Sequence, residues 1–245
     1  MRDQVGELQK ELKWINPKYS RQDVIEMHQH EFHRRPQKFL VLDDFVQADA
    51  LRSIRKLLLG EGQCEEMFRR YRDKSFVEKE KFYDSHDEDR FIHEFIYRKP
   101  ASGKEMAPST LEDVKMRAQI QSEAFHSWLR LLTGRDVQYT NAINLKRLDH
   151  EHFLRWHNDS AQGRVLCMVL YLHEDWQPGF GGRLQYKDEN NDIHNIDPLF
   201  NRVVIFDSNK NFNHAVEPMT PAATGWKRLN YSAWFQGDKT KNMNI

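Results

Sequence analysis

The sequence contains few cysteines and no long apolar run. Cys64 and Cys167 are the only cysteines among 245 residues and lie far apart, so they form neither a disulfide framework nor a zinc cluster. No stretch reaches the length of a membrane span, and the charged N-terminus lacks the apolar core of a signal peptide. We therefore expect a soluble, cytoplasmic protein with no membrane partner.

The chain also lacks an excess of charge of either sign. Its 37 Lys and Arg residues balance 37 Asp and Glu residues, so no net field attracts nucleic acid, and we expect no nucleic-acid partner. The mean hydropathy of −0.84 describes a polar surface. The 15 Phe, 8 Tyr and 6 Trp residues nevertheless supply bulky core material, which argues against a disordered chain.

Helical patterns are typical of the first half of the chain. Apolar residues at helical spacing predict a helix over residues 49–59, which Gly60 ends. A long amphipathic helix is predicted from Ser109, which begins a capping box, to Gly134. A short apolar run at residues 38–42 predicts a strand that leads into the first helix.

Short β-patterns separated by turn residues replace the helical ones near residue 137. Such regular spacing indicates an antiparallel sandwich or barrel, and thus a mainly β fold with flanking helices. The predicted strands cover residues 139–148, 152–156, 164–172, 183–187, 192–196, 202–206 and 228–235.

We expect a single domain over residues 1–245, because all-β folds of this length commonly form one domain. It would consist of a helical or lid-like part (1–136), a β core (137–236) and a short tail (237–245). The charged segment 61–108 remains undecided between a mobile lid and a surface helix.

Three residues of the second half form a candidate metal site. His157 and Asp159 lie two positions apart, which places them on one face of an extended chain. His214 follows the predicted strand 202–206 and its turn, and can supply a third ligand. Two histidines and one carboxylate that leave open coordination positions are the arrangement of non-haem Fe(II) oxygenases.

The His-x-Asp pattern alone is weak evidence, because His173 and Asp175 repeat it without a matching downstream histidine. The strand after His214 makes the pattern more specific. Its alternation places Arg228, Asn230, Ser232 and Trp234 on one face and apolar residues on the other. If the polar face points inward, Arg228 is a buried cation that needs an anion, since an unpaired one costs about 3–5 kcal/mol.

With these residues in place, the second half resembles the Fe(II)/2-oxoglutarate-dependent oxygenase superfamily, in its prolyl 4-hydroxylase-like branch. The resemblance covers about residues 139–236, and the segment 39–58 is weakly similar to the strand and helix that commonly precede this core. It implies a double-stranded β-helix (jelly-roll) core. The blocks that carry it are RWHNDS, VLYLHEDW, GGRLQY, DPLFNRVVIFDS, NHAVEP and KRLNYSAWF.

The resemblance implies an Fe(II)- and 2-oxoglutarate-dependent dioxygenase that uses O2. His157, Asp159 and His214 would hold the iron, and Arg228 would bind the distal carboxylate of 2-oxoglutarate. Tyr171 matches the tyrosine that assists there, and Ser232 shares the face of Arg228. The branch implies hydroxylation of an amino-acid centre, in an amino-acid-like small molecule or in a peptide or protein substrate.

The chain departs from the family in two places. The family often has a tyrosine followed by a glycine shortly before the His-x-Asp pair, whereas this chain reads RLDHEHFL. The substrate role of that tyrosine is therefore not expected here. The interval between His214 and Arg228 is longer than usual, and its residues EPMTPAATG are loop formers. Asp159 stands where halogenating members carry a small residue, which favours hydroxylation.

Several alternatives remain open. The other histidine clusters lack a complete ligand set and are interpreted as solvated or packing residues: His28, His30, His33, His150 and His152. For Arg228 the alternative is an internal ion pair, and for Tyr171 a core position. The rival functions are a non-catalytic β-sandwich binding module and a different metalloenzyme on the same fold.

Overall fold

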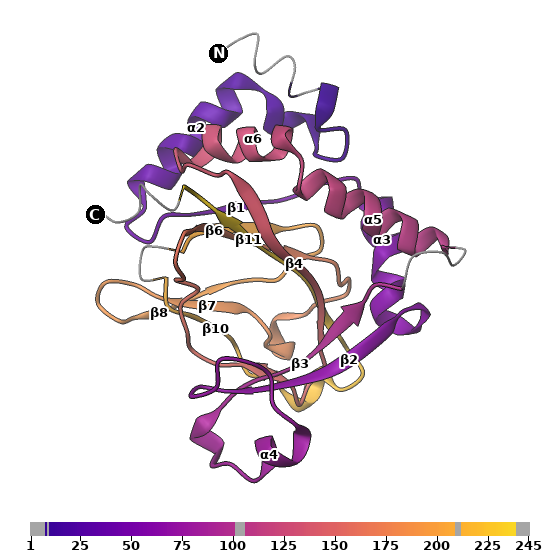
Figure 1. The fold of residues 1–245 in the computed structure, drawn as a ribbon. Helices are drawn as coiled ribbons and strands as arrows, with labels where there is room; N and C mark the ends of the chain where they lie inside the picture. Colours follow the sequence, from indigo (N-terminus) through magenta and orange to yellow (C-terminus); the bar gives the residue numbers. More distant parts are fainter. Residues whose placement is uncertain (1–7, 9, 101–105, 209–211, 239–245) are drawn as a thin grey trace.

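The computed structural model describes residue 8 and residues 10–100, 106–208 and 212–238, which form two antiparallel sheets. The major sheet has eight strands, ordered β1-β9-β6-β11-β4-β3-β2 with β5 paired to β3, and the minor sheet has the order β10-β7-β8. Figure 1 shows the major sheet curling around the minor one. The strands are β1 (Phe39–Leu42), β2 (Gln63–Arg70), β3 (Arg90–Arg98), β4 (Tyr139–Leu148), β5 (Phe153–Leu154), β6 (Arg164–Tyr171), β7 (Leu184–Lys187), β8 (Ile193–Ile196), β9 (Val203–Asp207), β10 (His214–Val216) and β11 (Arg228–Gln236).

Most of the helices cover the outer face of the major sheet, whereas the short helix between β2 and β3 lies at the end of that hairpin (Figure 1). Helix α6 is strongly amphipathic, and its buried residues Phe125, Trp128 and Leu132 join one core with α2 and the sheet. This confirms the predicted mainly β architecture with flanking helices. The helices are α2 (Gln22–Arg34), α3 (Ala48–Lys56), α4 (Lys79–Tyr83), α5 (Pro108–Ile120) and α6 (Glu123–Thr133).

Strand β11 separates this apolar core from a polar interior. Its residues Leu229, Tyr231, Ala233 and Phe235 belong to the core beneath the helices. The alternate residues face the space between the two sheets, as the sequence pattern predicted. The polar face therefore points inward, where it lines a cavity with Arg228, Asn230, Ser232 and Trp234.

The prediction of one long helix from Ser109 to Gly134 is wrong, because the structure has two helices, α5 and α6, in this segment. The chain breaks after Ile120, and Ser122 Oγ accepts a hydrogen bond of 3.2 Å from the Phe125 amide, which caps a new helix. Ser109 is not a cap, since its hydroxyl donates to Glu61 Oε2 at 2.7 Å. Gly134 does end the second helix, in the left-handed region at φ 66°.

The N-terminal part is less helical than predicted. Strands β1, β2 and β3 all belong to the major sheet, so the boundary near residue 137 does not separate helices from strands. The segment 61–108, expected to be a mobile lid or a surface helix, mainly forms the β2–β3 hairpin with the short helix α4 at its tip. Because β2 is partly exposed, charged residues occupy many of its positions, and the alternation of apolar and polar residues that would reveal a strand is absent from its sequence.

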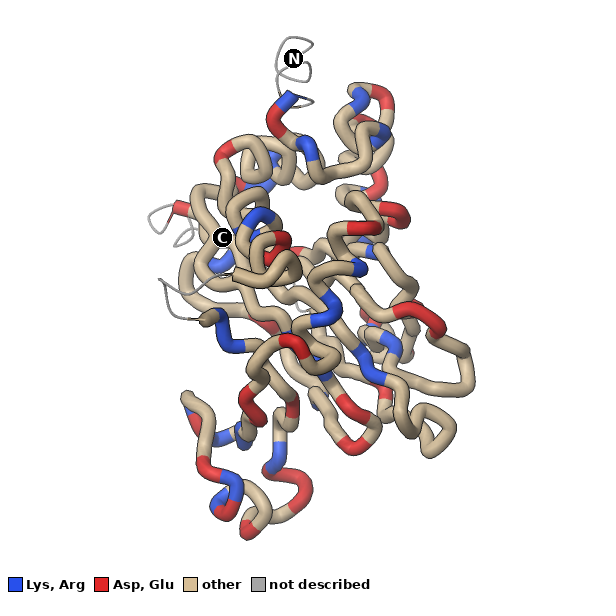
Figure 2. The backbone as a smooth tube through the Cα atoms, turned by 90° about the vertical axis from the view of Figure 1, so that its right-hand side faces the viewer, with Lys and Arg blue, Asp and Glu red and all other residues tan. Residues whose placement is uncertain are grey.

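No helix in the described part of the chain is long and apolar enough to cross a membrane. Acidic and basic residues are interleaved along the backbone in Figure 2, in keeping with the balanced composition.

The buried carboxylate of Asp113 links helix α5 to strand β11, and its loss should destabilise the protein. Asp113 is fully buried, accepts a hydrogen bond from the Tyr231 hydroxyl and pairs with Arg117 at 2.9 Å. In the variant Asp113→Ala, we expect the free energy of unfolding to fall by about 3–5 kcal/mol, because Arg117 and Tyr231 lose their partner. Urea unfolding measures this loss.

The matched control for this prediction is Glu112→Ala on the same helix. Glu112 forms a partly exposed pair with Lys115 at 2.8 Å, so its removal should cost less than about 1 kcal/mol. Equal losses in the two variants would contradict the account of Asp113.

Candidate active site

A cavity of about 520 Å³ lies between the two sheets and contains the predicted site residues. Its wall draws on strands β3, β4, β6, β7, β10 and β11 and on the segment that follows β5. Its polar and charged lining includes Glu94, Lys146, His157, Asp159, Arg164, His214, Arg228 and Asn230.

His157, Asp159 and His214 converge at one point of this cavity. His157 Nε2 lies 3.9 Å from Asp159 Oδ1, and His214 Nε2 lies 3.7 Å from Asp159 Oδ2. The backbone explains how residues so distant in sequence meet. The His157 amide donates to the His214 carbonyl at 2.9 Å, and the His214 amide donates to the His157 carbonyl at 2.8 Å. This reciprocal bridge fixes the two side chains next to each other.

Both imidazoles turn their Nε2 atoms toward the carboxylate. Nδ1 of His157 lies 2.8 Å from the Arg155 carbonyl, and Nδ1 of His214 lies 2.8 Å from the Phe212 carbonyl. A carbonyl partner selects the tautomer that donates from Nδ1 and leaves a lone pair on Nε2. Burial lowers the pKa of both histidines, which keeps them neutral.

The donor set suits a divalent ion. Ligand atoms about 2.1 Å from one ion and at right angles to each other are about 3 Å apart. The observed separations of 3.7 and 3.9 Å approach this value. Burial alone would raise the pKa of Asp159, but the neighbouring His214, His157 and Arg164 lower it, so the carboxylate is charged. The three residues can therefore hold a metal ion without rearrangement of the backbone.

Arg228 is a buried cation deeper in the same cavity, with 3% of its surface exposed. Its Nε donates to the Gly182 carbonyl at 2.8 Å and its Nη1 to Asn230 Oδ1 at 2.6 Å. The Tyr171 hydroxyl lies 3.5 Å from Nη2, a long contact. Among the described residues, no carboxylate forms an ion pair with Arg228, so the alternative of an internal salt bridge is wrong there.

Ser232 contacts this cation only through another residue. The Asn230 side chain donates to Ser232 Oγ at 3.0 Å while its own oxygen accepts from Arg228. Asn230 thus orients the guanidinium, a role that sequence reasoning did not assign to it. Strand alternation was the available signal, because it places Asn230 between Arg228 and Ser232.

Sequence reasoning also missed three charged residues of the cavity. Lys146 Nζ lies 2.9 Å from Glu94 Oε1, and both side chains are buried. Arg164 Nη1 donates to the Asp159 carbonyl at 2.6 Å, which holds the end of the His-x-Asp turn. Glu94 and Lys146 lie on strands β3 and β4, far from any recognisable motif, and only the pairing of these strands brings them together.

The second His-x-Asp pattern has a packing role. His173 is buried, accepts at Nδ1 from the Leu229 amide at 3.0 Å and contacts the Pro198 carbonyl through Nε2. Both ring nitrogens are therefore engaged by the backbone, which leaves neither for a metal.

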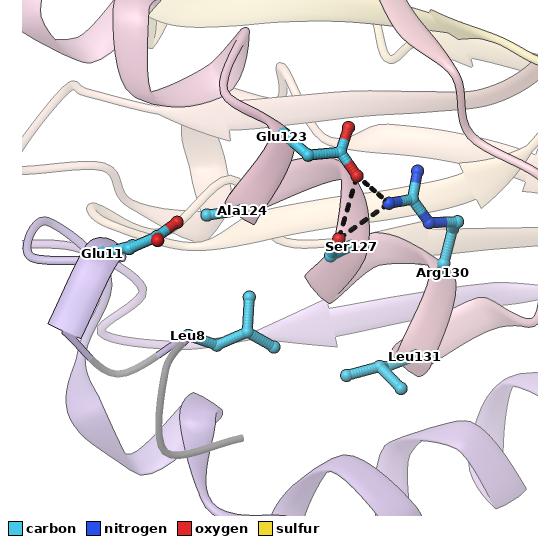
Figure 3. A pocket seen from close by; sticks show the side chains of 7 residues that line it. All are labelled: Leu8, Glu11, Glu123, Ala124, Ser127, Arg130 and Leu131. Atoms are coloured by element: carbon cyan, nitrogen blue, oxygen red, sulfur yellow. Dashed lines mark hydrogen bonds and ion pairs between the residues drawn. The ribbon is translucent and has the colours of Figure 1, made fainter. Parts of the chain in front are cut away.

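A second hollow, of about 360 Å³, lies on the surface between the N-terminal segment and α6 (Figure 3). Two of its three charged residues, Glu123 and Arg130, bind each other and Ser127, whereas the third, Glu11, lies apart from them. Among the described residues, this hollow therefore gathers no group of metal ligands comparable to that of the first cavity.

The model of the 2OG-Fe(II) oxygenase superfamily matches residues 143–236, a segment that contains the metal-site candidates and Arg228. The matched segment makes up less than half of the 245 residues. The match agrees with the resemblance noted in the sequence, and members of that family use Fe(II), 2-oxoglutarate and O2.

Two curated relatives of this chain are prolyl hydroxylases. The chain is 26% identical over 125 residues to prolyl 3-hydroxylase OGFOD1 of Mus musculus. This alignment covers 49% of this chain and 23% of the relative. A second match, the OGFOD1 of Xenopus laevis, is covered to 25%, so the chain spans about a quarter of the length of these curated relatives.

Two solved structures share the fold of this chain. A Trichoplax adhaerens prolyl hydroxylase in complex with a hypoxia inducible factor peptide fragment aligns with a TM-score of 0.64 at 17% identity, over 98% of this chain and 96% of that one. A Pseudomonas putida prolyl-4-hydroxylase aligns with a TM-score of 0.56 at 19% identity, over 87% of this chain and 99% of that one.

Proposed function

We propose that this protein is an Fe(II)- and 2-oxoglutarate-dependent dioxygenase that hydroxylates an amino-acid centre. The observation that carries the proposal is the pairing, in one cavity, of a His-Asp-His donor set with a buried guanidinium that lacks an ion-pair partner among the described residues. A non-catalytic binding module would have no use for this costly arrangement. We also infer that the curled sheets form a double-stranded β-helix.

In this proposal His157, Asp159 and His214 hold Fe(II), each through one atom. The Nε2 lone pairs and the charged carboxylate suit a ferrous ion and leave part of its coordination sphere open. The carbonyls of Arg155 and Phe212 keep the imidazoles in the ligating tautomer. The residues of this chain thus fit the ion that the family requires.

Arg228 binds the distal carboxylate of 2-oxoglutarate in the same proposal, because a buried guanidinium forms its strongest pair with a carboxylate. Tyr171 contacts the same group through its hydroxyl, and burial raises its pKa, which keeps that hydroxyl protonated. Asn230 and Ser232 hold the guanidinium in place. The co-substrate would thereby neutralise a charge that the protein leaves unpaired.

Bound Fe(II) supplies the oxidising chemistry, in which 2-oxoglutarate and O2 become succinate and CO2 while a substrate C–H bond becomes C–OH. The chain supplies geometry and exclusion of water. Apolar residues form part of the cavity wall, among them Val169, Leu184 and Val216. Exclusion of water from the reacting groups when substrate fills the cavity limits side reactions of the oxidant.

The substrate is proposed to be a prolyl residue in a peptide or protein. Prolyl hydroxylases stand among the relatives, and one of the structural neighbours was solved with a peptide. Exposed aromatic side chains at the cavity, Tyr71 and Phe76, offer a surface for such a chain. A free amino acid is the alternative substrate of the same chemistry.

A succinate-release screen tests this function. Prolyl peptides, free amino acids and small metabolites are each incubated with Fe(II), 2-oxoglutarate and O2, and the product is identified by mass spectrometry. The expected result is substrate-dependent succinate release and a product 16 Da heavier, the mass of one oxygen atom, for about each succinate formed. Turnover that continues without O2 would instead support a hydrolytic metalloenzyme.

The Glu94–Lys146 pair is expected to orient the substrate. Glu94 is 1% exposed, and its Oε2 has no hydrogen-bond partner within the described residues although it lines the cavity. The double variant Glu94→Gln with Lys146→Met removes both charges at once, so neither is left buried alone. Coupled hydroxylation should fall at least about 10-fold, the equivalent of about 1.4 kcal/mol, while substrate-free 2-oxoglutarate decay persists.

The matched control replaces an exposed ion pair of the neighbouring strand pair, Arg98→Met with Glu65→Gln. Coupled turnover should stay at the level of the unmodified protein. If the Glu94 and Lys146 variant also kept full coupling, the pair would have no part in substrate orientation.

A further inference from the structure

A second group of potential metal ligands lies on the other face of the β2–β3 hairpin. Glu66, His93 and His152 each present a ligand atom, and these atoms all lie within 4.8 Å of one another. Along β3, Ile92 and Glu94 line the cavity, so His93 between them points to the opposite face. This cluster is therefore separate from the candidate iron site.

The geometry of this cluster is similar to that of the candidate iron site. The rings of His93 and His152 have centroids 3.9 Å apart and planes inclined by 36°, whereas His157 and His214 show 4.1 Å and 50°. Glu66 Oε1 lies 2.8 Å from His93 Nε2 and 4.0 Å from His152 Nε2. An ion between these three atoms needs only small side-chain shifts to reach ligand distances near 2.1 Å.

His152 is a buried group without a satisfactory partner. It is 7% exposed, and its Nδ1 has no hydrogen bond within the described part of the chain. Its Nε2 lies 4.0 Å from Glu66, too far for a hydrogen bond. Burial and the neighbouring His93 lower the pKa of His152 to about 4, so the ring is neutral and offers a lone pair. A buried polar group left in this state requires an explanation, such as a bound ion.

We propose that Glu66, His93 and His152 bind a divalent transition-metal ion, with Zn²⁺ as the best match to two imidazoles and one carboxylate. The ion would displace the proton that His93 and Glu66 share, and this proton is released to solvent. Lys79 contacts the other oxygen of Glu66 at 3.4 Å, and its largely exposed side chain can move away. Oε1 remains available for the ion.

The bound ion would link two parts of the cavity wall. Glu66 and His93 belong to β2 and β3, while His152 lies in the turn between β4 and β5, five positions before His157. Three ligands from these segments would hold the hairpin against the strand that leads into the candidate iron site. The role of the ion is structural, since its ligands face away from the cavity.

The test uses the full chain with the candidate iron site removed, His157→Ala with His214→Ala, so that it does not depend on the proposed oxygenase function. After treatment with a chelator, this protein is titrated with Zn²⁺ against a chromophoric competitor. We expect one bound Zn²⁺ per chain, and its loss when His152→Phe is added. Phenylalanine keeps an aromatic ring beside His93 and removes the ligand, so the fold should persist, as circular dichroism would show.

The control adds His194→Ala, in place of His152→Phe, to the chain without the candidate iron site. This substitution breaks a partly exposed pair in which His194 Nε2 lies 2.7 Å from Asp188 Oδ2. Stoichiometry should stay at one ion in this protein. A chain without the candidate iron site that binds no Zn²⁺, or one that keeps its ion after His152→Phe, would overturn the proposal. Either outcome leaves the oxygenase assignment unaffected.

Discussion

Replacing His214 with alanine should reduce 2-oxoglutarate turnover by more than about 100-fold, or about 2.7 kcal/mol in activation free energy. His214 is proposed as a ligand of the iron, and Ala cannot replace its Nε2 donor. The backbone bridge between His214 and His157 uses no side-chain atoms, so the local fold should survive. Succinate release, measured with iron content and a thermal melt, checks the prediction.

His194→Ala is the matched control for His214→Ala, because His194 lies on the exposed strand β8 with Asp188 as its partner. This variant should retain both iron and turnover. A His214 variant that folds and keeps full activity would remove His214 from the ligand set.

Arg228→Met should raise the 2-oxoglutarate concentration for half-maximal turnover at least about 30-fold. The loss of a buried charge pair costs about 2–5 kcal/mol of binding energy. The lower bound, about 2 kcal/mol, corresponds to a roughly 30-fold weaker affinity for 2-oxoglutarate. When 2-oxoglutarate is absent, the same variant should unfold at no lower a temperature than the original protein, because removing an unpaired buried cation offsets the loss of its hydrogen bonds to Gly182 and Asn230. Stabilisation by added 2-oxoglutarate, in contrast, should disappear.

Arg98→Met provides the comparison for this variant, since Arg98 forms a half-exposed pair with Glu65 on the β2–β3 hairpin. Its half-saturating 2-oxoglutarate concentration should be unchanged. An Arg228 variant with unchanged half-saturation would show that another group binds the distal carboxylate.

The sequence predicted those parts of the site that depend on local periodicity. His157 and Asp159 are two positions apart on one extended segment, and the alternation of β11 directs Arg228 inward while Leu229 joins the core. The position of His214 was predicted from its place after β9, and the backbone bridge to His157 accounts for the meeting of these residues.

Features that depend on the register of distant strands were not predictable from one sequence. Glu94 and Lys146 meet because β3 pairs with β4, and His93 meets His152 because β3 pairs with β5. Neither pairing has a short-range signal. His152 was therefore interpreted as a solvated or packing residue, although the fold places it beside a second histidine and a carboxylate.

The prediction of one long helix was wrong for a reason unrelated to strand pairing. Apolar spacing continues from α5 into α6, and Ser122 is an ordinary residue within that period. Only its hydrogen bond to the Phe125 amide reveals a new helix start. Periodicity predicts which faces are buried better than it predicts where an element ends.

The most direct test of the central claim is an anaerobic titration of the metal-free protein with Fe(II) and 2-oxoglutarate, followed by visible absorption. The claim is that one cavity holds both ligands, the ion on His157, Asp159 and His214 and the keto acid on Arg228. For the unmodified protein, we predict a weak charge-transfer band that requires both additions and saturates at one iron per chain. The band should be absent in the His214→Ala variant. In the Arg228→Met variant, it should require a higher concentration of 2-oxoglutarate. A band that never forms in the folded, unmodified protein, or one that survives both substitutions unchanged, would contradict the account.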